Sequence, residues 1–373
     1  MRYFKLAAST AAFVAFAMPA MADYAVGALF PLSGPNATYG DIFMSGASLA
    51  AEHINADGLL KEKVAVLLED SQAMPQPAVV AMTKLVNVSK VPYVLTAFTG
   101  VSKAISTLAA RNHVVAVNGG GVGPDLAELG EYFWNVIPLA NYEVRAAVPY
   151  LVEQGKKRWA LVYVDDPLGA AAKAELAEQL PKVGAKLVDS FAVPTTAQQF
   201  AGIAAKVRAA DVDVVYIASY GSQQVQIVKQ LRESGVNAQF ISYSAMGTPD
   251  SIALPQAEGL LFTSQAIDFD SKDPVTSRFV ADFKAKFKRV PSTYTVNYYN
   301  AVRLFSLLVK HLEDKGLPVT GENLLAARTE IGSFDLVGGK VSFQKNGTLQ
   351  APIQVNQIGG GVVKVVKTYD LGE

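Results

Sequence analysis

Apolar and polar positions along this chain predict strands and helices in regular succession. Short apolar runs bounded by turn residues are typical of strands that are buried on both faces of a parallel sheet. Such runs occupy residues 24–30, 64–68, 93–97, 114–117, 159–164, 187–193, 212–218, 240–243 and 260–263. Helical segments lie between them, at residues 46–57, 77–88, 102–111, 142–154, 170–183, 198–210 and 223–234. This alternation predicts an α/β fold with two open, mostly parallel sheets flanked by helices and joined by right-handed crossovers.

The last third of the chain departs from this alternation. Long helices are predicted at residues 273–289 and 294–314, with a shorter one at 322–329, and strands at 340–343, 353–358 and 362–369. Three glycines at 359–361 predict a turn that makes the last two strands a hairpin. We infer that this segment completes the first lobe and ends on the second. The expected lobes are residues 23–140 with 266–350, and residues 141–265 with 351–373, joined by a hinge and separated by a cleft.

The N-terminal residues have the layout of a secretory signal. Arg2 and Lys5 precede a short apolar run, and Ala20 and Ala22 place small residues where a signal peptidase reads them. The run is too short to span a bilayer. We therefore expect residues 1–22 to be a signal peptide that is cleaved after Ala22, and the mature chain to be exported.

Composition restricts the partners and the compartment. Removal of residues 1–22 would take two basic residues and no acid from a chain with 33 of each, leaving a net charge of −2. This balance argues against nucleic acid or an anionic membrane as a partner, and no later apolar run approaches the ~20 residues of a membrane span. The chain has no cysteine, which excludes disulfides, thiol chemistry and a lipid-modified cysteine anchor. An exported chain with neither anchor nor disulfide best fits the periplasm.

The opening of the predicted mature chain resembles a known family. The segment from Phe30 to Gly58 is similar to the start of periplasmic solute-binding proteins of the leucine/isoleucine/valine-binding type. Its matching residues are Pro31-Leu32-Ser33-Gly34, Tyr39-Gly40, Gly46-Ala47 and Glu52-His53-Ile54-Asn55. Further matches are Asp70 and residues 200–217, 259–262 and 291–302. The resemblance implies a two-lobed type I periplasmic-binding fold, a monomer without cofactor or metal, and ABC permease subunits of the inner membrane as partners.

Two loops rich in small residues are the expected binding site. Thr99-Gly100-Val101 follows one predicted strand and starts a helix, and Gly119-Gly120-Gly121 follows the next. Backbone N–H groups at such turns favour an anion, although the glycines could simply permit tight turns. Because the resemblance aligns these segments with carboxylate-binding loops, we expect them to hold a ligand carboxylate.

The chain departs from the family pattern at two positions. The resemblance implies a threonine where Val122 stands, and an acid to pair with a ligand ammonium where Ser244 stands. A buried ammonium without a paired charge is costly, and Ser244 cannot supply that charge. Asp165 or Asp166 could substitute; otherwise the ligand has no ammonium.

Aromatic residues occupy other positions that the resemblance places at the cleft. Tyr39, Tyr220 and Tyr294 can stack on an apolar ligand and offer a hydroxyl, whereas Phe98 and Tyr243 could equally be packing residues. The ligand-contacting set expected from the resemblance is Tyr39, Thr99, Gly100, Val101, Gly120, Gly121, Val122, Leu168, Tyr220, Ser244 and Tyr294. An aromatic cleft with a carboxylate cradle favours an aromatic or keto acid as ligand.

Three alternatives stay open. One is a true leucine-type amino-acid-binding protein, and another is a ligand-binding module for sensing. The third is an enzyme, but the three histidines are far apart and HExxH, GxSxG and GxxxxGK[ST] motifs are absent from the sequence. The sequence therefore favours binding by hinge closure over catalysis.

Overall fold

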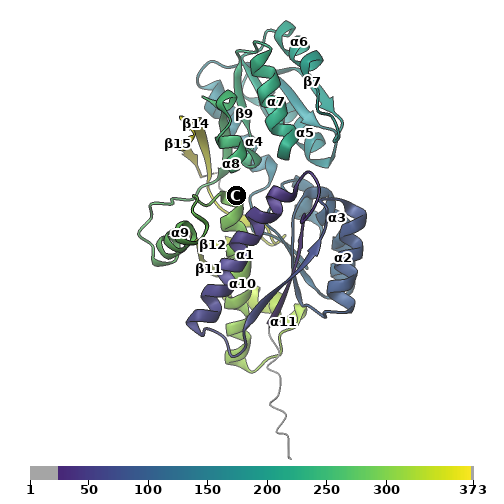
Figure 1. Cartoon of the computed structure of the whole chain (residues 1–373), viewed down its shortest axis with the longest axis vertical. Helices are drawn as coiled ribbons and strands as arrows, with labels where there is room; N and C mark the ends of the chain where they lie inside the picture. Colours follow the sequence, from purple (N-terminus) through teal and green to yellow (C-terminus); the bar gives the residue numbers. More distant parts are fainter. Residues whose placement is uncertain (1–23, 371–373) are drawn as a thin grey trace, which may run out of the picture.

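The computed structural model describes residues 24–370, so the predicted signal peptide and its cleavage site lie outside the described residues. Two α/β lobes are stacked one on the other, and the chain passes between them more than once (Figure 1). Within residues 24–370, no helix combines the length and the apolar character that a membrane crossing requires.

The first lobe is built on a five-stranded parallel sheet. Its strand order is β2-β1-β3-β4-β5, and the strands are β1 (Tyr24–Phe30), β2 (Val64–Asp70), β3 (Tyr93–Thr96), β4 (Val115–Asn118) and β5 (Phe133–Asn135). Helices α1 (Ala37–Asp57) and α10 (Thr293–Lys315) cover one face of this sheet, and α2 (Pro75–Asn87) and α3 (Thr99–Arg111) cover the other (Figure 1). Each face therefore has its own apolar layer.

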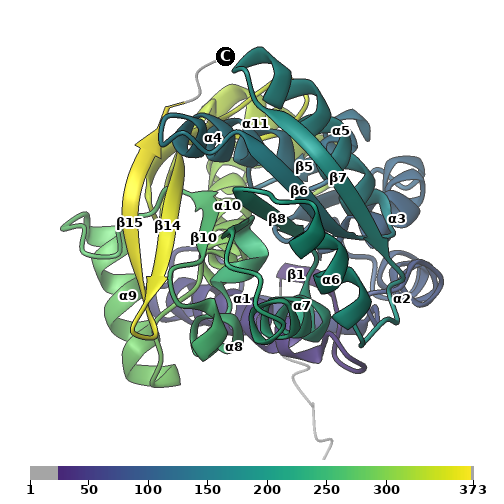
Figure 2. The ribbon, with the colours of Figure 1, turned by 90° about the horizontal axis from the view of Figure 1, so that it is seen from above.

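The second lobe is built on a seven-stranded sheet. Its order is β15-β14-β10-β9-β8-β6-β7, with only β14 and β15 antiparallel to their neighbours. The strands are β6 (Arg158–Val164), β7 (Lys186–Val193), β8 (Val214–Ala218), β9 (Gln239–Ser242), β10 (Leu261–Gln265), β14 (Ile353–Gly359) and β15 (Val362–Tyr369). The β14–β15 hairpin forms one edge and β7 the other (Figure 2). Its flanking helices are α4 (Ala140–Val152), α5 (Pro167–Lys182), α6 (Ala201–Ala209) and α7 (Gly221–Glu233).

The remaining elements lie on both lobes and around their junction. They are the 3₁₀ turns η1 (Pro124–Glu128), η2 (Ser244–Gly247) and η3 (Pro255–Ala257), helices α8 (Pro249–Ile252), α9 (Pro274–Phe287) and α11 (Gly321–Ile331), and strands β11 (Ser333–Leu336), β12 (Gly339–Phe343) and β13 (Leu349–Gln350). The last three form a small antiparallel sheet. The C-terminal hairpin predicted at residues 353–369 is confirmed. The exact division into lobes at residues 140, 265 and 350 stays a prediction.

Helix α1 differs most from the prediction, because it begins at Ala37 and not at Gly46. Gly40 and Gly46 are both internal to the helix and allow close packing. A Cβ on Gly46 would lie 2.1 Å from the carbonyl oxygen of Thr295 on α10. Strand β5 was also not predicted, since only three residues pair there.

Both sheets have the same strand order around one point. In the first sheet β1 lies between β2 and β3, and in the second β6 lies between β7 and β8. The connections diverge at β1/β3 and at β6/β8, and ligands of open α/β sheets bind beyond the carboxyl ends of strands at such switch points. A site between the lobes is therefore expected where these two points face each other.

Candidate functional site

A cavity of about 550 Å³ lies between the two switch points. From the first lobe it is lined by the segments after β1, β2, β3 and β4 and by Tyr294, and from the second lobe by the segments after β6, β7, β8 and β9. This volume falls within the roughly 300–1,000 Å³ of small-molecule sites. It provides room for a ligand that is enclosed from both sides.

The first-lobe side of the cavity is aromatic and buried. Tyr39 and Phe43 on α1 meet Tyr294 on α10, with ring centroids 5.9 Å apart for both Tyr39–Tyr294 and Phe43–Tyr294 in edge-to-face geometry. Phe98 adds an edge-to-face contact to Tyr39 at 5.7 Å. Burial raises the pKa of Tyr39 to about 12, so its hydroxyl keeps its proton at neutral pH. These rings offer an apolar ligand several surfaces to pack against.

The N-terminus of α3 opens onto the same side. Ser102 is the first residue whose N–H finds a carbonyl in the helix, that of Phe98 at 2.9 Å, and α3 has no side-chain cap. The preceding amides of Thr99, Gly100 and Val101 therefore have no intrahelical acceptor. The Thr99 hydroxyl accepts from the Gly123 N–H at 3.0 Å, which leaves its own proton free to donate. These groups form a neutral, donor-rich surface that suits a carboxylate.

The glycine loop after β4 acts differently from the prediction. The N–H groups of Gly120 and Gly121 both donate to the Asn118 side-chain oxygen, at 3.2 and 2.7 Å. These two amides are thus not the unpaired donors that the sequence suggested. A Cβ on Gly121 would lie 2.9 Å from the Thr99 backbone nitrogen, so the glycines bring this loop against the start of α3.

The second-lobe side carries the only charged lining residue found in the described part of the chain, Asp166. One of its oxygens caps α5 by accepting from the Gly169 N–H at 3.0 Å, and the other accepts from the Tyr220 hydroxyl at 2.8 Å. Burial raises the pKa of Asp166, although these hydrogen bonds oppose the shift. Asp165, its neighbour, is exposed and does not line the cavity.

The two sides touch at the mouth of the cavity. The Gly221 N–H, at the start of α7, donates to the Tyr39 hydroxyl at 3.2 Å. The rings of Phe98 and Tyr220 meet edge to face at 5.6 Å. Gly221 has a φ of +60°, and a Cβ there would lie 2.7 Å from the Asn36 side-chain oxygen. The lobes therefore lie in contact, with the cavity enclosed between them.

Ser244 does not line the cavity, contrary to what its place in the expected ligand-contacting set implied. It is buried behind Tyr294, and the two hydroxyl oxygens lie 3.3 Å apart. Its backbone N–H donates to Glu143 at 2.8 Å. The loop after β9 begins the 3₁₀ turn η2 at this residue.

The other predicted residues surround the cavity. These are Tyr39, Thr99, Gly100, Val101, Gly120, Gly121, Val122, Leu168, Tyr220 and Tyr294. Sequence reasoning missed Phe43 and Asn36, and also the polar residues Gln72, Thr195, Thr196, Gln198 and Ser222 at the cavity. Phe43 was missed because α1 was expected to begin after it. With the helix started earlier, its spacing of four from Tyr39 would have placed both on one face.

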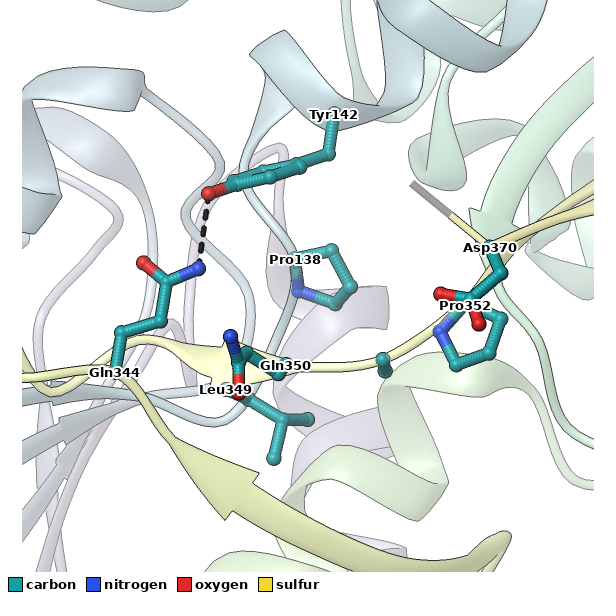
Figure 3. Close-up of a pocket in the computed structure, with 8 residues that line it drawn as sticks. Pro138, Tyr142, Gln344, Leu349, Gln350, Pro352 and Asp370 are labelled. Atoms are coloured by element: carbon teal, nitrogen blue, oxygen red, sulfur yellow. Dashed lines mark hydrogen bonds between the residues drawn. The ribbon is translucent and has the colours of Figure 1, made fainter. Parts of the chain in front are cut away.

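A second, smaller cavity of about 170 Å³ lies where the chain crosses between the lobes (Figure 3). It is lined by Pro138, Tyr142, Gln344, Leu349, Gln350, Ala351, Pro352 and Asp370. Gln344 donates from Nε2 to the Tyr142 hydroxyl at 3.0 Å, across this cavity (Figure 3). The bond joins the start of α4 to the segment after β12, so it connects the lobes on the hinge side.

Residues 24–370 contain no cluster of three or more metal-ligating side chains. His53, the most buried histidine, bonds Tyr299 and Asp282 between α1, α10 and α9, away from the cavity. The chemistry offered by the cavity is therefore neutral hydrogen bonding and aromatic packing, with one carboxyl group.

Comparison with known proteins agrees with this architecture. Residues 23–362 match the periplasmic binding protein family, and the Leu/Ile/Val-binding protein homolog 1 of Brucella melitensis biotype 1 is 28% identical over 353 residues, 92% of each chain. The structure of LivJ, a branched-chain amino acid transporter substrate binding protein of Streptococcus pneumoniae in complex with isoleucine, covers 93% of this chain and 100% of its own, with 20% identity and a TM-score of 0.84. An ABC transporter solute binding protein of R. palustris in complex with 4-hydroxybenzoate covers 94% of this chain and 97% of its own, with 19% identity and a TM-score of 0.84. The chain belongs to the periplasmic binding protein family.

Proposed function

We propose that this periplasmic solute-binding protein delivers small aromatic or keto acids to an ABC importer. The ligand docks on the first lobe, and hinge closure then brings the second lobe onto it. Export to the periplasm through cleavage after Ala22, a monomeric state, and recognition of the closed form by permease subunits are parts of the same proposal.

The observation that carries the ligand class is the lining of the 550 Å³ cavity. The aromatic rings of Tyr39, Phe98, Tyr220 and Tyr294 surround it, and the free amides at the start of α3 supply donors for a carboxylate. The single lining acid, Asp166, already accepts two hydrogen bonds. An aromatic acid would pack its ring against these aromatic side chains and accept hydrogen bonds from the amides with its carboxylate. It carries no positive charge that would need a partner in the cavity.

Asp166 also favours the second candidate, an amino acid of the leucine type. Its carboxyl group is the lining group, within residues 24–370, that could pair with a ligand ammonium. Related folds support both classes, since one neighbour holds isoleucine and another 4-hydroxybenzoate. An amino acid would need the negative charge of Asp166, whereas an aromatic acid would be repelled by it.

The deciding experiment is calorimetry on residues 23–373 with phenylpyruvate and phenylalanine, which share ring and carboxylate and differ in keto and ammonium groups. Benzoate, as a second acid without an ammonium group, and leucine, as a second amino acid, are measured in the same way. For an aromatic acid, Asp166→Asn should leave the affinity equal or raise it severalfold, because a negative charge near the ligand is lost. For an amino acid the same change should cost about a hundredfold, because a desolvated ammonium loses its partner.

Asp165→Asn is the matched control, since it removes an exposed neighbouring charge outside the cavity. If the protein binds phenylalanine and leucine but neither phenylpyruvate nor benzoate, the proposed ligand is an amino acid and not an aromatic or keto acid. Loss of ligand uptake in cells lacking the protein supports import; unchanged uptake with a lost transcriptional response would support sensing instead.

A further inference from the structure

The cavity between the lobes has a buried end and an exposed end of different chemistry. At the buried end, the lining includes the aromatic side chains of Phe43, Tyr243 and Tyr294, all of them buried. At the exposed end, five lining residues have polar side chains, and we call them the polar rim: Gln72, Thr195, Thr196, Gln198 and Ser222. The lining therefore changes from aromatic to hydrogen-bonding character toward solvent.

The side chains of the polar rim are neutral and available to a ligand. Within residues 24–370, none of the five forms a hydrogen bond through its side chain, and no lysine or arginine lines the cavity. Each amide and hydroxyl group can both donate and accept a hydrogen bond. The polar rim therefore suits a neutral polar group of a ligand, and it has no charge of its own to offer to a second ionised group.

The polar rim receives residues from both lobes. Gln72 follows β2 of the first lobe, whereas the other four residues follow β7 and β8 of the second lobe. The N–H and C=O groups of an amide point in opposite directions, so a single amide can donate to one lobe and accept from the other. A hydroxyl group has both functions on one atom. An amide nitrogen is also uncharged, so it needs no paired acid in the cavity.

Glutamine side chains of α7 hold the second-lobe part of the polar rim in place. The buried Gln223 donates from Nε2 to the carbonyl oxygens of Pro194 at 2.8 Å and Ala197 at 3.2 Å. Gln230 donates from Nε2 to the carbonyl oxygen of Gln198 at 2.8 Å. These bonds fix the segment between β7 and α6, which carries three of the five rim residues. Because this wall is already ordered, less conformational entropy is lost when a ligand binds.

The first-lobe part of the polar rim has an unusual backbone. Gln72 and Ala73 have φ values of +50° and +56°, so two consecutive residues other than glycine are left-handed. The Gln72 N–H donates to the Asp70 carboxylate at 2.8 Å, and the Ala73 N–H donates to the Ser71 hydroxyl at 3.3 Å. Backbone strain of this kind persists where neighbouring bonds hold it and is concentrated at ligand sites. Its position at the cavity agrees with a binding role for Gln72.

We propose that the polar rim is a specificity subsite for a neutral amide, that the ligand is an aromatic acid carrying an amide group, and that Gln223 is a positioning residue for this subsite. The proposal rests on the proposed function, because it keeps the ring and the carboxylate of that ligand and adds a third group. The buried end takes the ring, the amides at the start of α3 take the carboxylate, and the polar rim takes the amide. A cavity of about 550 Å³ is in the range that encloses drug-sized ligands, so it leaves room for more than one ring and one carboxylate.

The test is calorimetry on residues 23–373 with hippurate and 4-phenylbutanoate. Both acids join a phenyl ring to a carboxylate through a chain of equal length, but only hippurate has an amide in that chain. The wild-type protein should bind hippurate about tenfold more tightly, because the alkyl chain of the other acid leaves the rim without hydrogen bonds.

Variants of the polar rim should remove this preference. The double variant Thr195→Val/Thr196→Val keeps the side-chain shapes, and Gln198→Leu removes an amide. Each should lower the preference for hippurate to about twofold or less, with little change in the affinity for 4-phenylbutanoate. Gln199→Leu is the matched control, since Gln199 is an exposed neighbour that does not line the cavity. That variant should keep the tenfold preference.

The positioning role of Gln223 has its own test. Gln223→Leu removes both bonds to the segment between β7 and α6, so it should lower the preference for hippurate while 4-phenylbutanoate still binds. A loss of equal size for both acids would mean a structural role only, and an unchanged preference would also contradict positioning. Gln230→Leu breaks the other attachment of the segment and gives the same test if Gln223→Leu does not fold.

The outcomes separate this proposal from the proposed function. Equal wild-type affinity for the two acids, tighter binding of 4-phenylbutanoate, or binding of benzoate without hippurate overturns the amide subsite and leaves the aromatic-acid proposal standing. An undiminished preference for hippurate in both rim variants overturns the assignment of the amide to the polar rim. A folded wild-type protein that binds neither of these acids nor benzoate overturns the proposed function itself.

Discussion

The two sides of the cavity are built in different ways. On the first lobe, the buried rings of Tyr39, Phe43 and Tyr294 pack against one another between α1 and α10 of the same lobe. On the second lobe, Asp166 and Tyr220 are only half-buried and hold each other by a single hydrogen bond. The apolar residues on this side, including Leu168, pack with the first-lobe core and not with the cores of their own lobe.

This difference supports the proposed order of binding. The first-lobe side is held in place by its own packing, so it can receive a ligand before the lobes meet. The second-lobe side packs against the first-lobe core, so in the proposed mechanism it is completed by closure. Variants of the first side should therefore affect stability and binding together, whereas variants of the second should affect mainly binding.

The largest effect is expected from Gly46→Ala, in the contact between α1 and α10. The added Cβ would lie 2.1 Å from a backbone oxygen of Thr295 and 3.0 Å from the backbone nitrogen of Tyr299, so the helices must separate. We expect a loss of about 3 kcal/mol in the free energy of unfolding, measured with urea and far-UV circular dichroism. Benzoate binding should be lost as well, because the two helices carry Tyr39, Phe43 and Tyr294.

Gly202→Ala is the control for this variant. Gly202 lies in helix α6 of the second lobe, with no atom within 4 Å of the added Cβ. That substitution should leave the protein at least as stable as the wild type, because alanine lowers the conformational entropy of the unfolded chain. Equal stability of the Gly46→Ala and Gly202→Ala proteins would contradict the close packing of α1 and α10.

The next effect concerns Tyr220, on the second-lobe side. Tyr220→Ala removes the ring against Phe98 and the hydrogen bond to Asp166. We expect benzoate affinity to fall about thirtyfold, equivalent to about 2 kcal/mol, with little change in the stability of the ligand-free protein. Tyr220→Phe keeps the ring and should lose less. A wild-type affinity for Tyr220→Ala would remove this residue from the site.

Much of the fold could be predicted from the sequence because buried parallel strands leave continuous apolar runs. The starts of helices were harder, as α1 shows. Gly40 and Gly46 lie inside this helix and allow it to contact the backbone of Pro31 and of Thr295, and the hydrophobic pattern of the sequence does not reveal such close approaches. Strand β5 depends on three residues that pair with β4, and so short a segment has little pattern of its own.

The cavity-lining residues were largely predictable because they follow strand ends, where the resemblance also places them. What the sequence could not predict is the direction in which groups point. The amides of Gly120 and Gly121 turn toward Asn118, and Ser244 turns behind Tyr294. The burial of Glu143 could not be predicted either, since an acid near the start of a helix is normally a surface residue.

A smaller effect should come from Gly221, where the lobes meet. Gly221→Ala adds a Cβ 2.7 Å from the Asn36 side-chain oxygen and also disfavours the φ of +60°. Gly235→Ala has the same kind of backbone strain, at a φ of +79°, but no atom within 4 Å of its Cβ. Both variants should lose similar stability, whereas only Gly221→Ala should bind benzoate about tenfold more weakly. Adding Asn36→Ala should restore part of that affinity; no recovery would mean that the clash does not limit closure.

The smallest effect is expected on the hinge side, at the bond between Gln344 and Tyr142. Gln344→Ala removes one neutral hydrogen bond, worth about 1 kcal/mol at most, and should weaken benzoate binding by about threefold. Tyr142→Phe removes the same bond from the other lobe. Because both changes break one interaction, the double variant should bind no more weakly than either single variant, as a double-mutant cycle by calorimetry can measure. Additive losses would show that the two residues act separately. In that case the lobes would be coupled through the cavity mouth, where Tyr39 meets Gly221, and not through the hinge-side cavity.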